Sequence, residues 1–511
     1  METSKLGLST HCEQTLSLAK EWVTTCTSSH PNCSVGGQYP GPTRLLSLES
    51  ESVHLVFSAE MSSYPMYATL SHCWGNADLL KLDRQNLENF RTRIPEEELC
   101  KTFTEAIYIT RGLGLAYLWI DSLCIIQDDP QDWHNESATM TDVYGHSSVN
   151  IAASGARDGS VGCFFNRNVN SIRRLRISVP VGGDLSYYDC ANLHTISDMI
   201  TDSPLARRAW AFQERFLAPR TLHFTSSQVY WECRTRYACE TYPTVIPERL
   251  CQGPEYLPKL NAIPPLKLWS IVVMIYSRCV LTYQNDKLIA LSGVARYIQN
   301  QLKDNYVAGL WRGPLETQFC WRLWSSFSLE GRSTVYQAPS WSWASTNGRI
   351  TLPIPDQYTD PCFYVRVLRA ETTPVANDPL GQVTGGILQL QCLYFIESPE
   401  LVDTTYPVRL KFGEKELNWH LHWDSKPEAV KKVYFVPIIG THRIEGIFLE
   451  RFASSGKGHF RRLGYFMVSY ADAGAFREVV ATPECIPDES IYEESGGIDE
   501  DGNKFYVISI I

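Results

Sequence analysis

The strongest constraint on the fold is an alternation of strand and helix patterns between residues 67 and 153. Apolar runs bounded by turn residues predict strands, and apolar residues at intervals of three and four predict helices. The predicted strands cover 67–74, 117–126 and 149–153, and the predicted helices between them cover about 102–113 and 132–144. Because strand–helix–strand units bring successive strands side by side in one direction, the alternation predicts a parallel central sheet with flanking helices.

The ends of these strands carry the residues with the most chemistry. In a parallel sheet, functional side chains gather beyond the carboxyl ends of the strands. In this sequence those ends carry residues 74–75, 127–129 and 154–155. Asp121 is a carboxylate inside the second apolar run, and a charge in such a place needs a hydrogen-bond donor. We therefore expect a polar cleft at this edge of the sheet.

The rest of the chain divides into segments of different character. With 511 residues it is too long for one ordinary core, and two or three domains are expected. The pattern predicts a lead-in helix and loop over 1–52, an α/β domain over 53–235, a helical segment over 236–332 and a β-rich C-terminal domain over 333–511. Within the α/β domain a helix is predicted over 204–220, followed by a hairpin across Ser226 and Ser227.

Charge and hydropathy exclude two classes of partner. The net charge is −10 and no long run of Lys and Arg occurs, which argues against a nucleic-acid binder. The N-terminus lacks the basic start and apolar run of a signal peptide. No apolar segment approaches the length of about 20 residues that a membrane span needs. The sequence predicts a cytoplasmic protein that binds neither nucleic acid nor membrane.

The 16 cysteines are dispersed without the spacing of a disulfide framework, so most are expected to be reduced thiols. One group differs, since Cys26, His30 and Cys33 fall within eight residues at a spacing that resembles half of a zinc site. Only three candidate ligands are local, and no partner pair is evident. The favoured interpretation is a helix end followed by a turn, so no metal site is predicted.

Three segments of the sequence resemble the blocks that mark fungal heterokaryon incompatibility (HET) domains. They are residues 67–75 (YATLSHCWG), 117–127 (YLWIDSLCIIQ) and 208–215 (RAWAFQER), with Trp133, Glu136, Met140 and Tyr144 after the second block and Trp231 and Cys233 after the third. Their order and approximate spacing match as well. The resemblance spans residues 67–233, which is under half of the chain.

The resemblance implies a fold and a range of functions. HET domains are held to be related to Toll/interleukin-1 receptor (TIR) domains, so a TIR-like α/β domain is expected, in agreement with the parallel sheet. The family contains incompatibility proteins that act in self/non-self recognition and trigger programmed cell death. Other members lie in gene clusters of specialised metabolism.

Glu136 is the residue that the resemblance marks as catalytic. On the predicted helix, Trp133, Glu136 and Met140 share one stripe, and a carboxylate among apolar neighbours is costly unless it is paired. Some TIR domains hydrolyse NAD with a Glu placed shortly after a Trp, and Trp133 and Glu136 resemble that arrangement. A carboxylate there would stabilise the oxocarbenium ion that forms as nicotinamide leaves. The alternative is a structural ion pair to Arg208 or Arg215.

The arginine-rich third block supplies further candidates for binding. Asp121 is expected to pair with Arg208 or Arg215 in a network that lines the cleft. An arginine at such a site suits a carboxylate or phosphate ligand, whereas the alternative is a charged helix surface. The candidate binding residues are Trp74, Asp121, Trp133, Arg208, Trp210, Gln213 and Arg215.

Three functions remain open at this stage. The first is a recognition protein of the incompatibility class, activated by a protein partner or by self-association, with NAD as the candidate substrate. The second is an enzyme that has reused the HET fold to transform a small molecule in specialised metabolism. The third is a non-catalytic interaction module.

Overall fold

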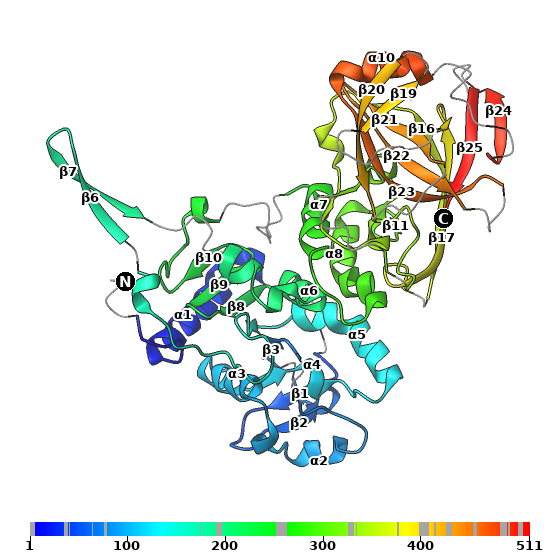
Figure 1. The fold of residues 1–511 in the computed structure, drawn as a ribbon. Coiled ribbons are helices and arrows are strands. Elements are labelled where there is room, and N and C mark those ends of the chain that lie inside the picture. The colour runs from blue at the N-terminus through cyan, green and yellow to red at the C-terminus, as the bar shows by residue number, and fades with distance from the viewer. Residues whose placement is uncertain are drawn as a thin grey trace. The chain divides into compact units, whose positions relative to one another are not determined.

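The computed structural model describes the chain apart from residues 1–5, 35–38, 40, 64, 76–78, 174, 191–196, 252–262, 325–331, 334, 376–377, 398–407, 413–414, 426–431, 453–456, 481–487, 489–490 and 499–503. The chain forms two units, Met1–Ile263 and Pro264–Ile511 (Figure 1). All the residues that the sequence marks as candidate site residues lie in the first unit.

The sheet of the first unit is mixed, with parallel strands at its centre. Its order is β10-β9-β8-β5-β3-β4-β1-β2. The strands are β1 (Arg44–Ser47), β2 (His54–Phe57), β3 (Tyr67–Ser71), β4 (Tyr117–Trp119), β5 (Val149–Ala152), β8 (Arg220–Phe224), β9 (Val229–Cys233) and β10 (Tyr237–Cys239). Strands β8, β5, β3 and β4 run parallel to one another, and the strands outside them pair antiparallel. The predicted parallel centre is confirmed, and antiparallel strands border it on both sides.

The second predicted strand is wrong beyond residue 119. Strand β4 ends at Trp119, and the chain then turns into the short helix α4 (Asp121–Cys124). Asp121 favours this turn because its Oδ1 accepts a hydrogen bond from the N–H of Ser122 at 2.8 Å. A buried apolar run has no periodicity that separates a strand from a buried helical turn. Asp121 therefore begins a helix at the carboxyl end of the sheet instead of lying within a strand.

Helices cover both faces of this sheet. They are α1 (Glu13–Ser29), α2 (Leu87–Thr92), α3 (Lys101–Gly112), α5 (Pro130–Gly145) and α6 (Ala209–Leu217). The crossovers β3-α3-β4 and β4-α5-β5 run in opposite directions across the sheet, so right-handed connections place α3 and α5 on opposite faces. Figure 1 shows α1 and α3 on one side of β3 and α5 and α6 on the other.

The ends of the helices follow from local chemistry. Asp129 caps α5, because its side chain accepts the N–H groups of Gln131 and Asp132, and Pro130 occupies the first position. The predicted helix over 204–220 is shorter than expected. Helix α6 begins after Arg208 and ends before Pro219, which disfavours helical backbone in the residue before it.

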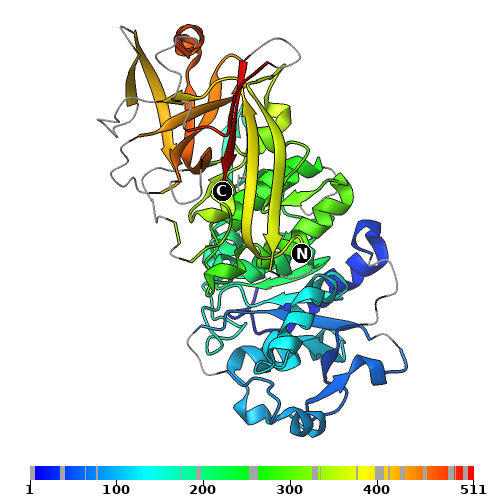
Figure 2. The ribbon, with the colours of Figure 1, turned by 90° about the vertical axis from the view of Figure 1, so that its right-hand side faces the viewer.

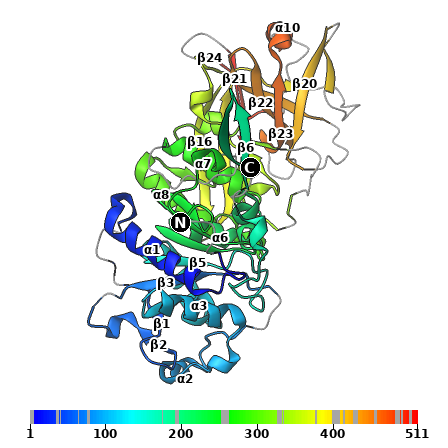
Figure 3. The ribbon, with the colours of Figure 1, turned by 90° about the vertical axis from the view of Figure 1, so that its left-hand side faces the viewer.

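Segments outside the strand–helix alternation complete the first unit. Strand β1 pairs with β4, so the stretch predicted as a lead-in contributes a strand to the sheet. Helix α1 lies beside α3 (Figure 3), and its Trp22 stacks on Trp231 of β9 with ring centroids 6.3 Å apart. The predicted hairpin across Ser226 and Ser227 is confirmed as β8 and β9. A separate hairpin, β6 (Leu175–Val181) and β7 (Asp184–Cys190), lies between β5 and α6 in the sequence.

The second unit begins with helices and continues as a β-rich region, as predicted. Its helices are α7 (Pro265–Tyr276), α8 (Ser292–Leu302), α9 (Leu315–Gln318) and α10 (Tyr470–Val480). Its strands are β11 (Tyr306–Val307), β12 (Leu310–Trp311), β13 (Arg322–Leu323), β14 (Ile350–Thr351), β15 (Cys362–Phe363), β16 (Val365–Pro374), β17 (Val383–Cys392), β18 (Ile396–Glu397), β19 (Val408–Phe412), β20 (Lys415–Trp423), β21 (Tyr434–Gly440), β22 (Ile444–Arg451), β23 (His459–Val468), β24 (Glu494–Ile498) and β25 (Lys504–Ile510). Figure 2 shows the long strands β16 and β17 beside β25, with which β17 pairs antiparallel.

Aromatic residues dominate one core of the second unit. The ring of Trp419 lies 4.6 Å from that of Phe435 and 4.8 Å from that of Phe466, centroid to centroid. Among the described residues of both units, we find no helix with both the length and the apolar character that crossing a membrane requires.

Candidate functional site

Three of the predicted site residues meet at the carboxyl edge of the parallel strands. Trp74 follows β3 and Asp121 follows β4, and parallel neighbours end at the same edge. The indole Nε1 of Trp74 donates a hydrogen bond to Oδ2 of Asp121 at 3.0 Å. Arg208, which precedes α6, places Nη2 3.5 Å from the same oxygen and donates through Nη1 to the carbonyl of His72. Of the two arginines predicted as partners of Asp121, the structure pairs Arg208 with it.

Two cations face the ring of Trp74. Lys81 places Nζ 5.2 Å from the ring centroid, and the guanidinium carbon of Arg208 lies 5.8 Å from it. Both distances are within the range of cation–π attraction. Trp74 is half-buried, the Arg208 side chain is 24% exposed, and Lys81 is exposed, so this group is partly exposed. We call Trp74, Lys81, Asp121 and Arg208 the Trp74 cluster.

A buried carboxyl group, Glu214 of α6, lies behind the Trp74 cluster. Burial raises its pKa from 4.5 to about 7, Arg208 lowers it, and the charge of Asp121 raises it. Oε2 of Glu214 has no hydrogen-bond partner among the described residues. The pKa of Arg208 is raised, because the carboxylates of Asp121 and Glu214 outweigh the effect of its burial. The sequence did contain a signal for Glu214, which lies three residues from both Ala211 and Leu217 and so shares a buried face of the helix with these apolar residues.

His72 is fully buried beside the same group. Burial lowers its pKa to about 4, against the opposing influence of Asp121, so the ring is neutral at physiological pH. Its Nδ1 lies 3.8 Å from Oδ1 of Asp121, and neither ring nitrogen has a hydrogen-bond partner within the described residues. The ring packs edge-on against Phe103, with centroids 5.0 Å apart. His72 therefore acts in packing.

Glu136 belongs to a different group of charges. It is buried on α5, and its Oε1 lies 3.5 Å from Nη2 of Arg44 on β1. The same Arg44 nitrogen pairs more closely with Asp132, at 2.6 Å. The predicted partners of Glu136, Arg208 and Arg215, are wrong, because the arginine comes from the stretch that was expected to be a lead-in. Burial raises the pKa of Glu136, although hydrogen bonding from Thr43 and the charge of Arg44 oppose this.

The remaining predicted residues lie on α5 and α6. Trp133 and Trp210 pack edge to face, with ring centroids 6.4 Å apart, and both are half-buried. Gln213 is buried. Arg215 pairs with Glu232 of β9, at 2.8 Å between Nε and Oε2.

Glu232 connects Arg215 to a second polar group that sequence reasoning missed. Nε2 of His223 lies 2.8 Å from Oε2 of Glu232, and Nδ1 of His223 lies 3.1 Å from Oγ of Ser154. A serine, a histidine and a carboxylate bonded in this order also form the catalytic triad of hydrolases, in which they act as nucleophile, base and the group that orients the base. However, all three residues are buried, and the adjoining cavity has a volume of about 20 Å³, enough for about one water molecule. This group is a structural network, since no substrate fits beside Ser154.

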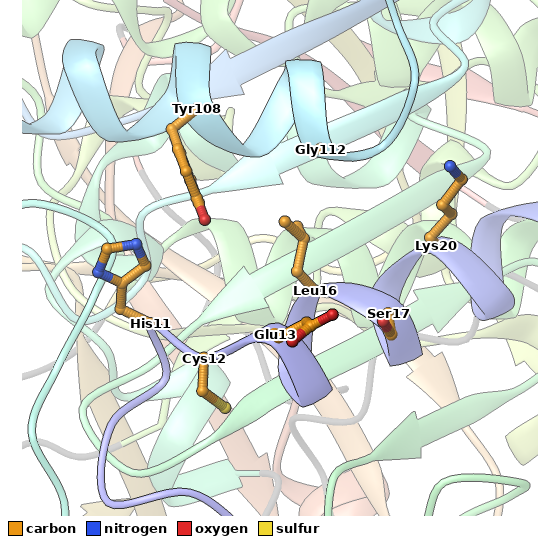
Figure 4. Close-up of a pocket in the computed structure, with 8 residues that line it drawn as sticks. All are labelled: His11, Cys12, Glu13, Leu16, Ser17, Lys20, Tyr108 and Gly112. Atoms are coloured by element: carbon orange, nitrogen blue, oxygen red, sulfur yellow. The ribbon is translucent and has the colours of Figure 1, made fainter.

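A larger pocket lies elsewhere in the first unit, between α1 and α3. Its volume is about 290 Å³. Figure 4 shows Tyr108 and Gly112 of α3 on one side of it and residues of α1 and the segment before α1 on the other. No predicted site residue lines this pocket.

Comparison with known proteins agrees with the resemblance noted in the sequence. No curated protein and no solved structure matches the chain. The family model described as "Heterokaryon incompatibility protein (HET)" matches residues 67–214. This range contains β3, β4 and β5 with their crossover helices, and it contains Trp74, Asp121, Arg208 and Glu214. Residues 67–214 of this chain are therefore a heterokaryon incompatibility (HET) domain.

Proposed function

We propose that this chain is a self/non-self recognition protein of heterokaryon incompatibility, whose HET domain binds NAD at the Trp74 cluster and hydrolyses it, leading to programmed cell death. The observation that carries the proposal is the half-buried indole of Trp74 with two cations over its ring and a carboxylate at its edge. The HET domain supports the recognition role, and the geometry of the cluster supports the choice of a nucleotide.

The residues of the Trp74 cluster suit the parts of a dinucleotide. An indole face stacks on a nucleobase or on nicotinamide. Lys81 and Arg208 supply the positive charge that a pyrophosphate requires, and Arg208 can bind two oxygens at once. In the proposed step, water attacks C1 of the ribose and the carbon–nitrogen bond breaks with its electron pair going to nicotinamide. ADP-ribose, nicotinamide and one proton are released.

A carboxylate near the ribose lowers the barrier of this step, because the transition state has oxocarbenium character. The resemblance to TIR domains pointed to Glu136, but Arg44 and Thr43 hold that side chain inside the domain. Asp121 is the carboxylate that contacts Trp74 and Arg208. The proposal therefore gives the electrostatic role to Asp121, and Arg208 orients that carboxylate.

The test is nicotinamide release from NAD by the purified full-length protein. We expect release by the wild type, and loss of about 100-fold or more with Asp121→Asn, as for other preorganised charges at a reacting centre. Glu136→Gln should retain most of the activity. Asp142→Asn is a matched control, since Asp142 is an exposed carboxylate on α5. Melting temperatures measured in parallel separate lost chemistry from lost folding.

Two further measurements test NAD binding and toxicity. Arg208→Lys and Lys81→Ala should each weaken NAD binding, measured by calorimetry, and expression in a fungal host should be toxic for the wild type and harmless for Asp121→Asn. NAD binding without nicotinamide release at high protein concentration would refute hydrolysis and favour an interaction module that senses a nucleotide. Absence of NAD binding would refute the proposal as a whole.

A further inference from the structure

Four potential metal ligands meet where α1 ends beside β9. Cys26 lies in the last turn of α1, His30 directly follows the helix, and Cys33 ends the short 3-10 turn Pro31–Cys33. The fourth is Cys233, the last residue of β9. Their ligand atoms all lie within 4.8 Å of one another. We propose that these four side chains bind one Zn²⁺ ion, which fastens α1 to the sheet that carries the HET domain.

The donor set and its geometry fit zinc. Zinc in structural sites takes four ligands in a tetrahedron, and three cysteines with one histidine is one of its common sets. Bonds of about 2.3 Å to sulfur and about 2.05 Å to nitrogen place these two atoms about 3.6 Å apart in a tetrahedron. The distance from Sγ of Cys233 to Nδ1 of His30 is 3.6 Å. Thiolate ligands favour zinc over magnesium or calcium, which prefer oxygen.

The site is largely buried, as is usual for a structural site. Cys26, Cys33 and Cys233 are buried, and His30 is half-buried. Four protein ligands leave no open position for a substrate, which distinguishes this arrangement from a catalytic zinc site. The proposed ion therefore has a structural role, in holding residues 26–33 against the end of β9.

A buried arginine supplies a separate argument. Arg220 of β8 is 4% exposed, and its Nε donates to Sγ of Cys26 at 3.2 Å. Its other contacts are the carbonyls of Ser148 and Cys33, at 3.3 and 2.9 Å. Within the described part of the chain no carboxylate pairs with it. Burying a guanidinium without an anion is unfavourable. Three thiolates and one Zn²⁺ carry a net charge of −1, which Arg220 neutralises.

Other donors are placed for thiolates. The backbone N–H of Arg236 donates to Sγ of Cys233 at 3.4 Å, and the hydroxyl of Thr235 lies 3.5 Å from Sγ of Cys33. On the helix side, the N–H of His30 bonds to the carbonyl of Cys26, and the N–H of Cys33 bonds to that of His30. These contacts fix both halves of the site, and hydrogen bonds of this kind orient metal ligands and stabilise their charge.

The alternative for these cysteines is oxidation. A disulfide would use two of the three thiols, and it would not explain why the third cysteine, His30 and Arg220 lie beside them. All three cysteines are free in the structure. Sequence spacing favoured a simple helix end because it offered only three ligands, and the fourth lies 200 residues after Cys33 in the chain. The structure reverses that interpretation by folding the β8–β9 hairpin against α1.

The test is the metal content of the full-length protein, purified with zinc in the medium and without chelator. We expect one zinc per chain by mass spectrometry of the metal. Exchange for Co²⁺ should give the visible absorption of tetrahedral cobalt and its thiolate charge-transfer bands. Cys33→Ser and Cys233→Ser should lose the zinc. Cys163→Ser is the matched control, since Cys163 is also buried but lies outside the cluster, and it should keep the metal.

Two variants keep the proposal testable if ligand removal prevents folding. His30→Cys should retain one zinc with a cobalt spectrum shifted towards four thiolates. Arg220→Met leaves all four ligands in place and should weaken zinc binding about 10- to 100-fold, as the loss of other outer-shell partners does. A wild-type protein without bound zinc, a cobalt spectrum without thiolate bands, or a disulfide among these cysteines under reducing conditions of purification would each overturn the proposal.

Discussion

Replacing Glu214 by Gln should stabilise the protein at alkaline pH and leave it nearly unchanged in mild acid. Glu214 is buried behind Arg208, and burial raises its pKa from 4.5 to about 7. A carboxyl group whose pKa is higher in the folded state binds its proton more tightly there. The contribution of Glu214 to stability is therefore greatest below the unfolded pKa of 4.5, and it is lost as the pH rises through about 7.

The size of the effect follows from the two pKa values. Each pKa unit corresponds to about 1.4 kcal/mol, so ionising Glu214 in place costs about 3 kcal/mol of the free energy of unfolding above neutral pH. Gln keeps the shape of the side chain and carries no charge at any pH. For a domain of 150–250 residues, each kcal/mol moves the melting temperature by about 2–4 °C. The variant should thus melt about 6–12 °C above the wild type at about pH 8 and close to it at about pH 5.

The assay is thermal unfolding of wild type and Glu214→Gln in matched buffers across this range. Glu88→Gln serves as the control, because Glu88 is an exposed carboxylate on α2. A difference in melting temperature that does not change with pH would refute the reasoning, since it would mean that Glu214 titrates alike in the folded and unfolded chain. Destabilisation at about pH 8 would also refute it, by showing that the charge is needed to hold Arg208.

Two further predictions concern the neighbouring charges. Glu136→Gln should change the free energy of unfolding by less than about 1 kcal/mol, because Arg44 keeps its closer partner, Asp132. Asp132→Asn should cost about 2–4 kcal/mol, because it leaves Arg44 buried with the weaker partner. Equal losses of stability in chemical denaturation would contradict this prediction. His72, with a pKa of about 4 in the folded state against 6.5, should destabilise the protein as the pH falls from about 6.5 to about 4, by about 3 kcal/mol in total. Above pH 6.5 it should have no such effect, and His72→Phe, which keeps a ring against Phe103, should remove the acid sensitivity; an unchanged acid limb in the variant would show that another group causes it.

The centre of the fold could be predicted because strands and crossover helices have different periods. The patterns at residues 67–74 and 149–153 identified β3 and β5, and the direction of both strands followed from the helices between them. The run 117–126 was misread, since apolar character alone cannot distinguish a strand that continues from one that turns into a buried helix. Asp121 contributes to the turn through a hydrogen bond that its side chain accepts from the N–H of Ser122, an interaction that the apolar pattern does not reveal.

The candidate site was predicted only in part. Charges in apolar stripes must find partners, and this argument brought Asp121 together with Arg208. It could not choose partners across the sheet, because sequence distance does not report which strands become neighbours. As the alternative to catalysis, Glu136 was expected to pair with Arg208 or Arg215, but β1 pairs with β4 and carries Arg44 to α5 instead. Lys81 gave no signal at all, since nothing in its surroundings marks it until the loop after β3 is folded.

The error over the partner of Glu136 and the missed fourth metal ligand share one cause. The matched range 67–214 contains three of the four central parallel strands, but β8, which pairs with β5, and β1, which pairs with β4, both lie outside it. Arg44, the partner of Glu136, comes from before the range, and Cys233 comes from after it. A sheet cut at both sides would expose its unpaired backbone edges and leave Glu136 without its arginine. The segments on either side are thus part of the same folding unit, and a zinc ion between α1 and β9 would join them directly, since it binds the first segment to the last.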